Sequence, residues 1–330
     1  MSVPIDAVVA VTYRCDSRCT MCNIWQLPPG FELSPQDYRR LPRTLRDINV
    51  TGGEPFLRDD LVEIVRILDE HCNHPRIVIS TNGFQRRRIM HAAPGLMAIG
   101  RNIGLAVSLD GIGEKHDEIR GMAGGFDKVV ETLTQLRTIK YRNVRVAFTA
   151  QRDNVQHLGA VYDLSRQFGF EFTIAVAQNS EFYFSTGENR AVDPLDLAAE
   201  LKYVMRKELM SASPKRWLRA YFSQGIIRYN ASRKRMLACR AGVDSFFMDP
   251  AGLVYPCLTL NRLMGDIRAN TFEEIWSGAA AHRVREDVRR CAEPCWMICT
   301  ARTAMMRNPQ EPARWILANW LRILGGREVG

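Results

Sequence analysis

The sequence predicts an α/β fold built on a parallel sheet of about six strands. Short, nearly continuous apolar runs rich in Val and Ile recur along the first half of the chain. Each run is followed by a polar or glycine-bearing turn and then by a helical pattern. Continuous apolar runs are typical of parallel strands buried on both faces, and strand–helix alternation predicts a parallel sheet. Periodicity alone leaves an open barrel and a doubly wound sheet as alternatives.

The expected elements alternate regularly. Strands are expected at residues 7–12, 47–50, 76–80, 104–109, 144–149 and 172–176. A helix is expected to begin at Ser34, because serine caps a helix and Pro35 suits its first turn. The other helices are expected at residues 60–72, 126–139 and 154–168. Six strands are too few for a closed eight-stranded barrel.

Residues 187–238 are expected to form helices that lead to a second unit, which begins near Cys239. This unit contains a β-hairpin, since two short apolar runs flank a turn at residues 249–252 that contains proline and glycine. Thr271 and Glu274 form a capping box that opens another helix. The chain is therefore expected to divide into a strand–helix unit at residues 1–186, a helical linker at 187–238, a hairpin domain at 239–300 and a helical tail at 301–330.

The composition, with 46% hydrophobic and 25% charged residues, is typical of a soluble globular protein. No apolar run approaches the roughly 20 residues of a transmembrane helix, and the first residues lack a signal-peptide pattern, so a cytoplasmic location is expected. The net charge of +9 suits an anionic substrate or an acidic redox partner, and is also common on surfaces that bind neither. The apolar residues of the segment 312–324 recur at helical spacing, and we expect this helix to pack on the protein itself rather than on a membrane.

The nine cysteines are concentrated in two places. Three lie within residues 15–22 and five within 239–299, while Cys72 stands apart at the end of an expected helix. Because the cytosol keeps thiols reduced, metal binding or catalysis explains these sets better than disulfides do. Cys72 is expected to be a small buried apolar side chain.

The first set, Cys15, Cys19 and Cys22, directly follows the first expected strand. Three thiolates on one short loop can hold three corners of a cubane iron–sulfur cluster and leave the fourth iron open. An open metal position is what catalysis needs, whereas a structural site is usually closed. The spacing alone also allows a structural zinc site with a distant fourth ligand.

Five segments together resemble the motifs of the radical S-adenosylmethionine (radical SAM) superfamily, over about residues 5–180. They fall at the carboxyl ends of expected strands, where barrel and open α/β enzymes place their sites. A structural zinc loop does not predict this convergence. The segments are Thr12–Trp25, Thr51–Pro55, Ser80–Gly83, Ser108–Gly111 and His116–Gly121.

The resemblance implies a partial (βα)6 TIM-like barrel with a catalytic [4Fe-4S] cluster on Cys15, Cys19 and Cys22. It further implies reductive cleavage of S-adenosylmethionine (SAM) to a 5′-deoxyadenosyl radical, which abstracts hydrogen from a substrate while the protein supplies position and shelter. The residues expected to contact SAM are Met21, Gly52, Gly53, Glu54, Asn82, Ser108, Asp110 and Arg120.

The glycine-rich motif suits this ligand. Gly52 and Gly53 allow the backbone to approach a ligand closely. Glu54 can accept hydrogen bonds from an ammonium group.

The remaining expected contacts are short polar groups and one cation. Asn82, Ser108 and Asp110 suit ribose hydroxyls or the methionine moiety, although Asn82 and Ser108 are equally suited to capping their own loops. Arg120 can pair with the methionine carboxylate. Met21 stands where the family often has an aromatic residue against the adenine, and it offers a softer surface.

The second cysteine set resembles the auxiliary-cluster domains called SPASM and twitch, in which a hairpin separates two ligands. A full SPASM domain brings seven cysteines and two clusters. Five cysteines are present here, so we expect one auxiliary [4Fe-4S] cluster of the twitch kind. The expected ligands are Cys239, Cys257, Cys295 and Cys299, with Cys291 able to replace one of the last two. A structural zinc knot is the alternative.

The resemblance implies an enzyme of dehydrogenase, epimerase or carbon–carbon bond-forming type, with flavodoxin or ferredoxin as electron donor. Peptide-modifying members often carry a leader-binding domain ahead of the barrel. Here the first strand begins within ten residues, so we expect a small-molecule substrate: a sugar, a nucleotide or a natural-product intermediate. A peptide delivered by a partner is the alternative. Nucleic acid is not expected, because no RNA-binding module is present.

Substrate contact is expected from Glu181, Tyr183 and Arg190, which follow the sixth strand, although they are equally typical of loop residues. An auxiliary cluster with four cysteine ligands suits acceptance of an electron from the substrate, or structural support. The alternative from another class is a non-enzymatic electron-transfer or zinc-binding protein. Such a protein would need only the cysteines and none of the residues expected to contact SAM.

Overall fold

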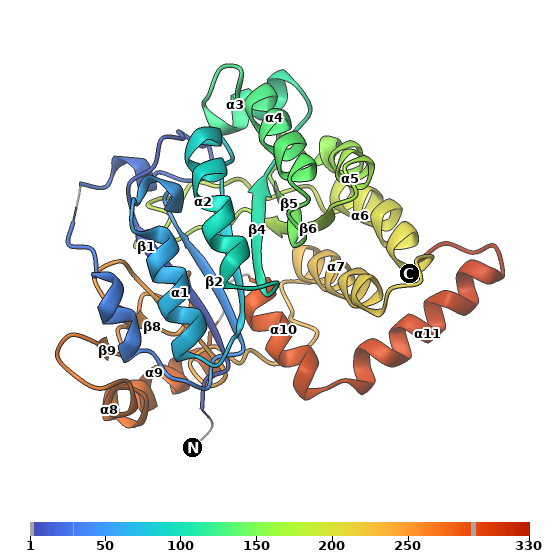
Figure 1. Cartoon of the computed structure of the whole chain (residues 1–330). Coiled ribbons are helices and arrows are strands. Elements are labelled where there is room, and N and C mark those ends of the chain that lie inside the picture. Colours follow the sequence, from blue (N-terminus) through green and yellow to red (C-terminus); the bar gives the residue numbers. More distant parts are fainter. Residues whose placement is uncertain (1–2, 29, 292–294) are drawn as a thin grey trace.

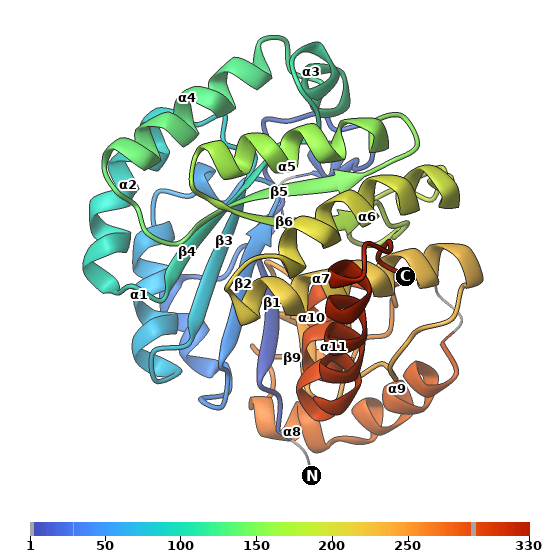
Figure 2. The same ribbon diagram turned by 90° about the vertical axis from the view of Figure 1, so that its right-hand side faces the viewer.

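The computed structural model describes residues 3–28, 30–291 and 295–330 of the chain. One continuous sheet curves through the molecule, and helices cover its outer side (Figures 1 and 2). The strands are β1 (Asp6–Thr12), β2 (Asp47–Gly52), β3 (Arg76–Thr81), β4 (Ile103–Ser108), β5 (Val144–Ala150), β6 (Glu171–Val176), β7 (Ser245–Met248), β8 (Leu253–Tyr255) and β9 (Gly265–Asp266).

The first six strands form a parallel sheet in sequential order, so the expected partial barrel is confirmed. Each begins and ends within two residues of its expected bounds, because continuous apolar runs mark buried parallel strands clearly. β6 forms one end of the nine-stranded sheet, whose order is β6-β5-β4-β3-β2-β1-β7-β8-β9.

The helices of the barrel are α1 (Leu61–His71), α2 (Arg86–Ile99), α3 (Glu114–Arg120), α4 (Gly125–Thr138) and α5 (Leu158–Gln167). The helix expected at Ser34 is only a short 3-10 helix, η2 (Pro35–Arg40). The helix α2 was not expected from the sequence, because three arginines begin it and Pro94 interrupts its apolar periodicity. Two further 3-10 helices flank the site, η1 (Ile24–Gln26) and η3 (Pro55–Leu57), and a third, η4 (Val155–His157), precedes α5.

The second half of the chain is mostly helical. It contains α6 (Pro194–Leu209), α7 (Pro214–Ser232), α8 (Phe272–Ser277), α9 (Ala279–Arg289), α10 (Ile298–Arg307) and α11 (Gln310–Leu324). The capping box of Thr271 and Glu274 is present at the start of α8, as expected.

The hairpin of the second unit is not separate from the barrel. β7 pairs in parallel with β1, with Asp6 opposite Ser245 and Val9 opposite Met248. β8 and β9 then continue the same sheet in antiparallel order. The second unit therefore extends the barrel wall on the side away from β6.

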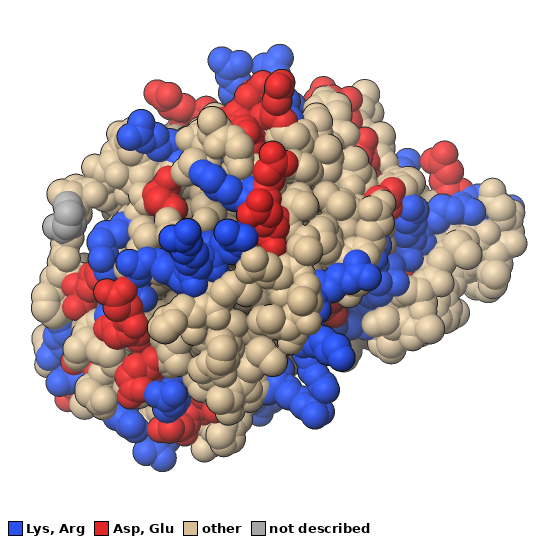
Figure 3. Space-filling view, turned by 45° about the horizontal axis from the view of Figure 1, so that its top comes forward, with Lys and Arg blue, Asp and Glu red and all other residues tan. Residues whose placement is uncertain are grey.

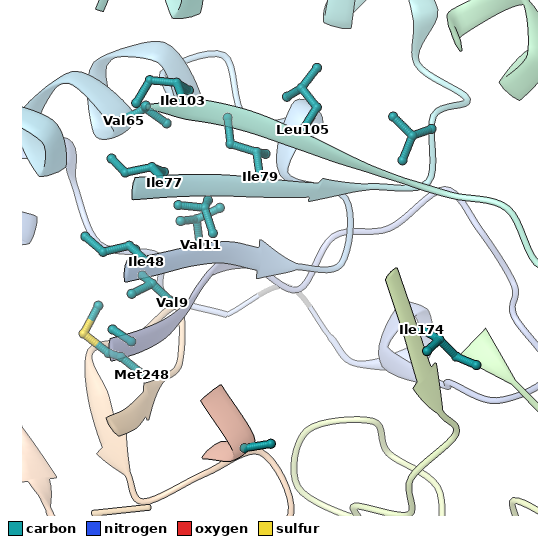
Figure 4. Packing of buried hydrophobic residues seen from close by; sticks show 14 of the residues in the cluster. Val9, Val11, Ile48, Val65, Ile77, Ile79, Ile103, Leu105, Ile174 and Met248 are labelled. Carbon is teal, nitrogen blue, oxygen red and sulfur yellow. The ribbon is translucent and has the colours of Figure 1, made fainter. Parts of the chain in front are cut away.

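The main core lies between the sheet and its outer helices. Figure 4 shows Val9, Ile48, Ile77 and Ile103 from four neighbouring strands in one apolar layer, with Val65 of α1 nearby. All of these side chains are at most 2% exposed. Burial of this layer is the main favourable contribution to the fold.

The opposite faces of the strands point into the barrel, where the polarity changes along the strands. The first inward positions of β2, β3, β5 and β6 are all charged, and they form two pairs that lie opposite each other in neighbouring strands: Asp47 with Arg76, and Arg145 with Glu171. The last inward positions are small and polar: Thr51, Ser80, Ser108 and Thr149. The two ends of the barrel therefore offer very different chemistry.

The C-terminal helix α11 packs on the body of the protein. The rings of Trp217 and Trp320 meet edge-to-face at 4.3 Å, and the Trp320 indole N–H donates to the Leu209 carbonyl at 2.8 Å. No helix in the described part of the chain combines the length and apolarity needed to cross a membrane. Figure 3 shows basic and acidic side chains interspersed over one face of the molecule.

Candidate functional site

A pocket of about 970 Å³ lies at the carboxyl ends of the barrel strands. Its lining includes the three cysteines of the first set and six of the eight residues expected to contact SAM: Met21, Gly52, Gly53, Asn82, Ser108 and Arg120. Glu54 and Asp110 do not line it. The fold thus gathers residues spread over more than 100 positions at one place.

The cysteine loop is fastened to the end of α3. The backbone N–H of Arg18 donates to the Arg120 carbonyl at 3.0 Å, and the Ser17 hydroxyl donates to the same oxygen at 2.9 Å. Gly121 has a φ of 59°, and a Cβ there would lie 2.4 Å from the Arg18 carbonyl oxygen. Only glycine allows this close contact without strain.

The three thiols fit a cubane cluster with an open iron, because all of them face one cavity large enough for a cluster and a ligand. Burial raises the pKa of Cys15 to about 12 and that of Cys22 to about 11, so the metal-free thiols are protonated at neutral pH. Cluster assembly here releases protons. The Cys19 sulfur lies 3.7 Å from an Arg120 guanidinium nitrogen and 3.1 Å from the Ser17 hydroxyl.

Gly52 and Gly53 bring the backbone close to the start of the cysteine loop. A Cβ on Gly52 would lie 2.1 Å from the Thr12 carbonyl oxygen, and a Cβ on Gly53 would lie 2.2 Å from that of Arg14. The Gly53 N–H donates to the Thr12 carbonyl at 2.8 Å. These glycines were expected to let the backbone approach a ligand closely. In the structure they let it approach the start of the cysteine loop, and this contact supports the loop.

Glu54 is fully buried and turned away from the pocket. Its carboxylate accepts hydrogen bonds from the Asn82 N–H at 2.7 Å, the Phe56 N–H at 3.0 Å and the Thr81 hydroxyl. These bonds tie the ends of β2 and β3 together. Direct contact between Glu54 and a ligand ammonium stays a prediction that this arrangement does not support.

Burial raises the pKa of Glu54 to about 7, against the opposing effect of its backbone hydrogen bonds. A raised pKa means that the folded state prefers the protonated acid, so wild-type stability falls as pH rises from 4.5 to 7. Glu54→Gln removes this titration. We expect the free energy of unfolding of the variant, relative to wild type, to rise by up to about 3 kcal/mol between pH 4.5 and 8. Urea unfolding at several pH values measures this difference. A constant difference would show that folding does not raise the pKa of Glu54; Glu114→Gln, at an exposed position, is the control.

Asp110 and Arg120 form a buried ion pair beside the pocket. The Asp110 carboxylate is 2.5 Å from the Arg120 Nε and also accepts from the Thr149 N–H at 2.6 Å. Asp110 is fully buried, while Arg120 is 8% exposed and lines the pocket. Asp110 therefore positions Arg120 beside Cys19, and its own contact with a ligand stays a prediction.

Asn82, Ser108 and Met21 line the pocket as expected. The Asn82 side chain also braces its loop, since it donates to Asp16 at 2.7 Å and accepts from the Phe84 N–H at 2.9 Å. Met21 is 8% exposed, and its sulfur accepts from Gln151 at 2.9 Å. The thioether is therefore held in place at the pocket wall.

The pocket at the carboxyl ends of the strands, where SAM is expected to bind, is called the SAM pocket below. Of the three residues expected to contact substrate, only Tyr183 lines it. Its hydroxyl donates to the Gly52 carbonyl at 3.3 Å, and burial raises its pKa above the usual value. Arg190 lines a neighbouring side pocket, and Glu181 lines neither. The sequence reasoning missed Met297, which lines both pockets and lies between two auxiliary cysteines; no local pattern marks it.

The auxiliary cysteines come together in the second unit. Cys257 is close enough to Cys295 and to Cys299 to raise the pKa of both thiols, and Cys239 and Cys291 also raise the pKa of Cys295. The Leu260 N–H donates to the Cys257 sulfur at 3.3 Å, and an Arg235 nitrogen donates to the Cys295 sulfur at 3.4 Å. Such donors stabilise cluster-bound thiolates, so the set fits an iron–sulfur cluster. Burial raises the pKa of Cys295 to about 12.

The two cysteine sets share one small apolar cluster. Cys15, Cys22 and Cys299 all pack against it. Its buried members are Val8, Ala10, Ile24, Tyr183, Phe247 and Leu258. The auxiliary unit therefore lies directly beside the barrel site. In contrast, Cys72 is 2% exposed at the end of α1, the small buried residue expected there.

The side pocket, of about 760 Å³, opens beside the free edge of β6. Five residues line both pockets: Ala175, Val176, Ala177, Gln178 and Met297. The rest of its wall includes Arg190, Arg233, Tyr229 and Trp296. The two pockets are therefore adjacent, with β6 and Met297 between them.

Comparison with known proteins agrees with the expected family and with the auxiliary iron–sulfur domain. A family model described as "Radical SAM superfamily" matches residues 9–164, and one described as an iron–sulfur cluster-binding domain, SPASM, matches residues 239–300. The chain is 27% identical to the AdoMet-dependent heme synthase of Methanosarcina barkeri, over 86% of this chain and 85% of that protein. It is 26% identical to the mycofactocin maturase MftC of Mycobacterium tuberculosis, over 86% of this chain and 73% of that protein.

The fold has solved counterparts. SuiB of Streptococcus suis, solved with bound S-adenosylmethionine, aligns with a TM-score of 0.64 at 15% identity and covers 88% of this chain and 66% of SuiB. At this identity the likeness concerns the fold alone.

Proposed function

The chain belongs to the radical SAM superfamily and carries a SPASM-type iron–sulfur domain, and on this premise we propose an oxidoreductase acting on a carboxylate-bearing small molecule in the side pocket. The observation that carries the proposal is the adjacency of the two pockets across β6 and Met297. A substrate in the side pocket would be next to the SAM site and beside the auxiliary cysteines.

Each part of the barrel site has a role in this proposal. Cys15, Cys19 and Cys22 would hold the catalytic [4Fe-4S] cluster, which supplies the electron for radical cleavage of SAM when bound. Arg120, held by Asp110, offers a guanidinium to the methionine carboxylate. Met21 offers an apolar surface to the adenine.

The auxiliary unit supports an oxidation. The segment 295–299 contributes Met297 to the pocket wall and two cysteines to the auxiliary set. Cys239, Cys257, Cys295 and Cys299 would hold one cluster, which supplies an electron acceptor close to the substrate. We propose that net dehydrogenation is the reaction type, with an acidic flavodoxin or ferredoxin as the reductant for SAM cleavage.

The side-pocket lining favours a carboxylate-bearing substrate. Arg190 and Arg233 are the cations of the lining, and guanidinium groups pair with carboxylates in a two-pronged geometry. Tyr229 and Trp296 add aromatic surface suited to a flat ring system. The similarity to a heme synthase over most of both chains supports a carboxylated tetrapyrrole as the substrate class.

A peptide is the second candidate substrate. It is supported by the similarity to a mycofactocin maturase and by the outer edge of β6, which pairs with no other strand of the described sheet and to which an extended peptide can add main-chain hydrogen bonds. A peptide side chain or terminal carboxylate could then reach Arg190.

The test uses the full chain reconstituted anaerobically. Iron-coproporphyrin III is the probe, and its visible absorption band reports binding. We expect saturable binding that is weakened at least about tenfold in the double variant Arg190→Gln/Arg233→Gln and in the esterified probe, because each removes the charge pairing. Arg314→Gln, on exposed α11, is the matched control. If the double variant bound the probe as tightly as the wild type and the control variant do, and the wild type bound the esterified probe equally well, the tetrapyrrole assignment would be wrong. Deoxyadenosine formation stimulated by a peptide instead would establish the second candidate.

A further inference from the structure

We propose that the protein binds a small organic anion, a carboxylate or a phosphate monoester with an apolar body, in a second cavity at the opposite end of the barrel from the cysteine loop. The cavity has a volume of about 840 Å³. It lies at the beginnings of β3, β5 and β6 and is closed by residues of α6, α7 and α10. It shares no lining residue with the SAM pocket or the side pocket.

The lining of this cavity is strongly basic. Five cations line it: Arg76, Arg145, Lys215, Arg219 and Arg302. The single carboxylate in the lining is that of Glu208, which already accepts from Arg216 at 2.8 Å and from the Tyr162 hydroxyl at 2.8 Å. A cavity with this balance attracts anions.

Four of the cations have carboxylate partners next to the cavity. Arg76 pairs with Asp47, and Arg302 pairs with both Asp6 and Asp47. Lys215 and Arg219 share Glu171, at 2.6 Å and 2.5 Å. Among the described residues no carboxylate pairs with the fifth cation, Arg145.

Arg145 carries the inference. Its Nε is buried and has no hydrogen-bond partner in the described part of the protein. Among the described residues its one hydrogen bond is long, from Nη2 to the Asn143 side chain at 3.4 Å. Burial lowers the pKa of Arg145 to about 10, helped by the nearby Arg219 and opposed by Glu171, which already pairs with Lys215 and Arg219. A largely buried guanidinium that has no carboxylate of its own is costly, and a bound anion lowers that cost.

The remaining wall defines the rest of the ligand. Most of it is apolar, with Phe172, Ile174, Leu218, Phe222, Ile298 and Met305 facing the cavity. An inorganic ion would leave this surface uncovered. An anion with an apolar body would cover it while its charged end reaches Arg145.

The test measures binding rather than catalysis, so it does not depend on the proposed function. Sodium octanoate is the first probe and inorganic phosphate the second, each titrated calorimetrically at constant ionic strength into the full, cluster-loaded chain. We expect one octanoate per chain, and at least about tenfold weaker binding to Arg145→Met, which keeps an unbranched apolar stem but removes the guanidinium charge. Arg145→Lys should retain most of the affinity.

Arg142→Met is the matched control, since Arg142 is exposed three residues earlier on the same segment. Without ligand, Arg145→Met should unfold at a denaturant concentration no lower than wild type, because it removes an unpaired buried charge. Phosphate binding without octanoate binding would overturn the apolar part of the proposal. Binding of neither probe, or equal octanoate binding by Arg145→Met, would overturn it entirely.

Discussion

Cys22→Ala abolishes 5′-deoxyadenosine formation and lowers the iron content of the reconstituted protein from about eight to about four per chain. This is the largest effect on activity that the structure predicts. Cys22 is one of three thiols that face the SAM pocket, and a cubane cluster needs all three to keep one open iron. The auxiliary cysteines form a separate ligand set and should still assemble their cluster. Chromatographic detection of deoxyadenosine, after reduction with dithionite, and an iron and sulfide count on the same sample measure both effects.

Cys72→Ala is the matched control for this prediction. Cys72 is buried at the end of α1, away from both cysteine sets, and should leave iron content and deoxyadenosine formation unchanged. Cys299→Ala completes the comparison, because it should lower the iron content by a similar amount through the auxiliary cluster. Full deoxyadenosine formation by Cys22→Ala, or zinc in place of iron in the wild type, would refute the assignment of the first cysteine set.

Gly53→Ala is expected to cause the largest loss of stability among the substitutions considered. The added methyl group would lie 2.2 Å from the Arg14 carbonyl oxygen and 2.8 Å from that of Tyr13. Both contacts are to backbone atoms, so no side chain can rotate away, and β2 or the cysteine loop has to move. We expect the free energy of unfolding to fall by about 3 kcal/mol or more. Because the displaced loop carries Cys15, iron incorporation should fall as well.

Gly187→Ala separates this effect from the general cost of replacing glycine. A Cβ on Gly187 would meet nothing within 4 Å, so this variant should unfold within about 0.5 kcal/mol of wild type. Urea unfolding of both variants gives the comparison. If Gly53→Ala were as stable as Gly187→Ala and bound as much iron, the close packing of β2 against the cysteine loop would be wrong.

Several features of the molecule were predictable from the sequence because they depend on neighbouring residues. Continuous apolar runs marked all six barrel strands, since a parallel strand buried on both faces has to be apolar throughout. The short spacing of Cys15, Cys19 and Cys22 marked a metal loop, and Thr271 marked the start of α8 through its capping box. The helix α2 was missed because arginines and a proline obscure its periodicity.

Other features were decided only by the tertiary structure, because they depend on residues far apart in the chain. β7 joins β1 across more than 200 residues, which makes the auxiliary unit part of the barrel wall. Glu54 was expected to contact a ligand, and the fold buries its carboxylate against the N–H of Phe56, two residues on, and that of Asn82 after the next strand. Met297 and Arg145 belong to no local motif, and each acquires its place only through packing between distant elements. Local sequence patterns therefore determined the strands and the cysteine loop, whereas long-range packing decided which side chains face each cavity.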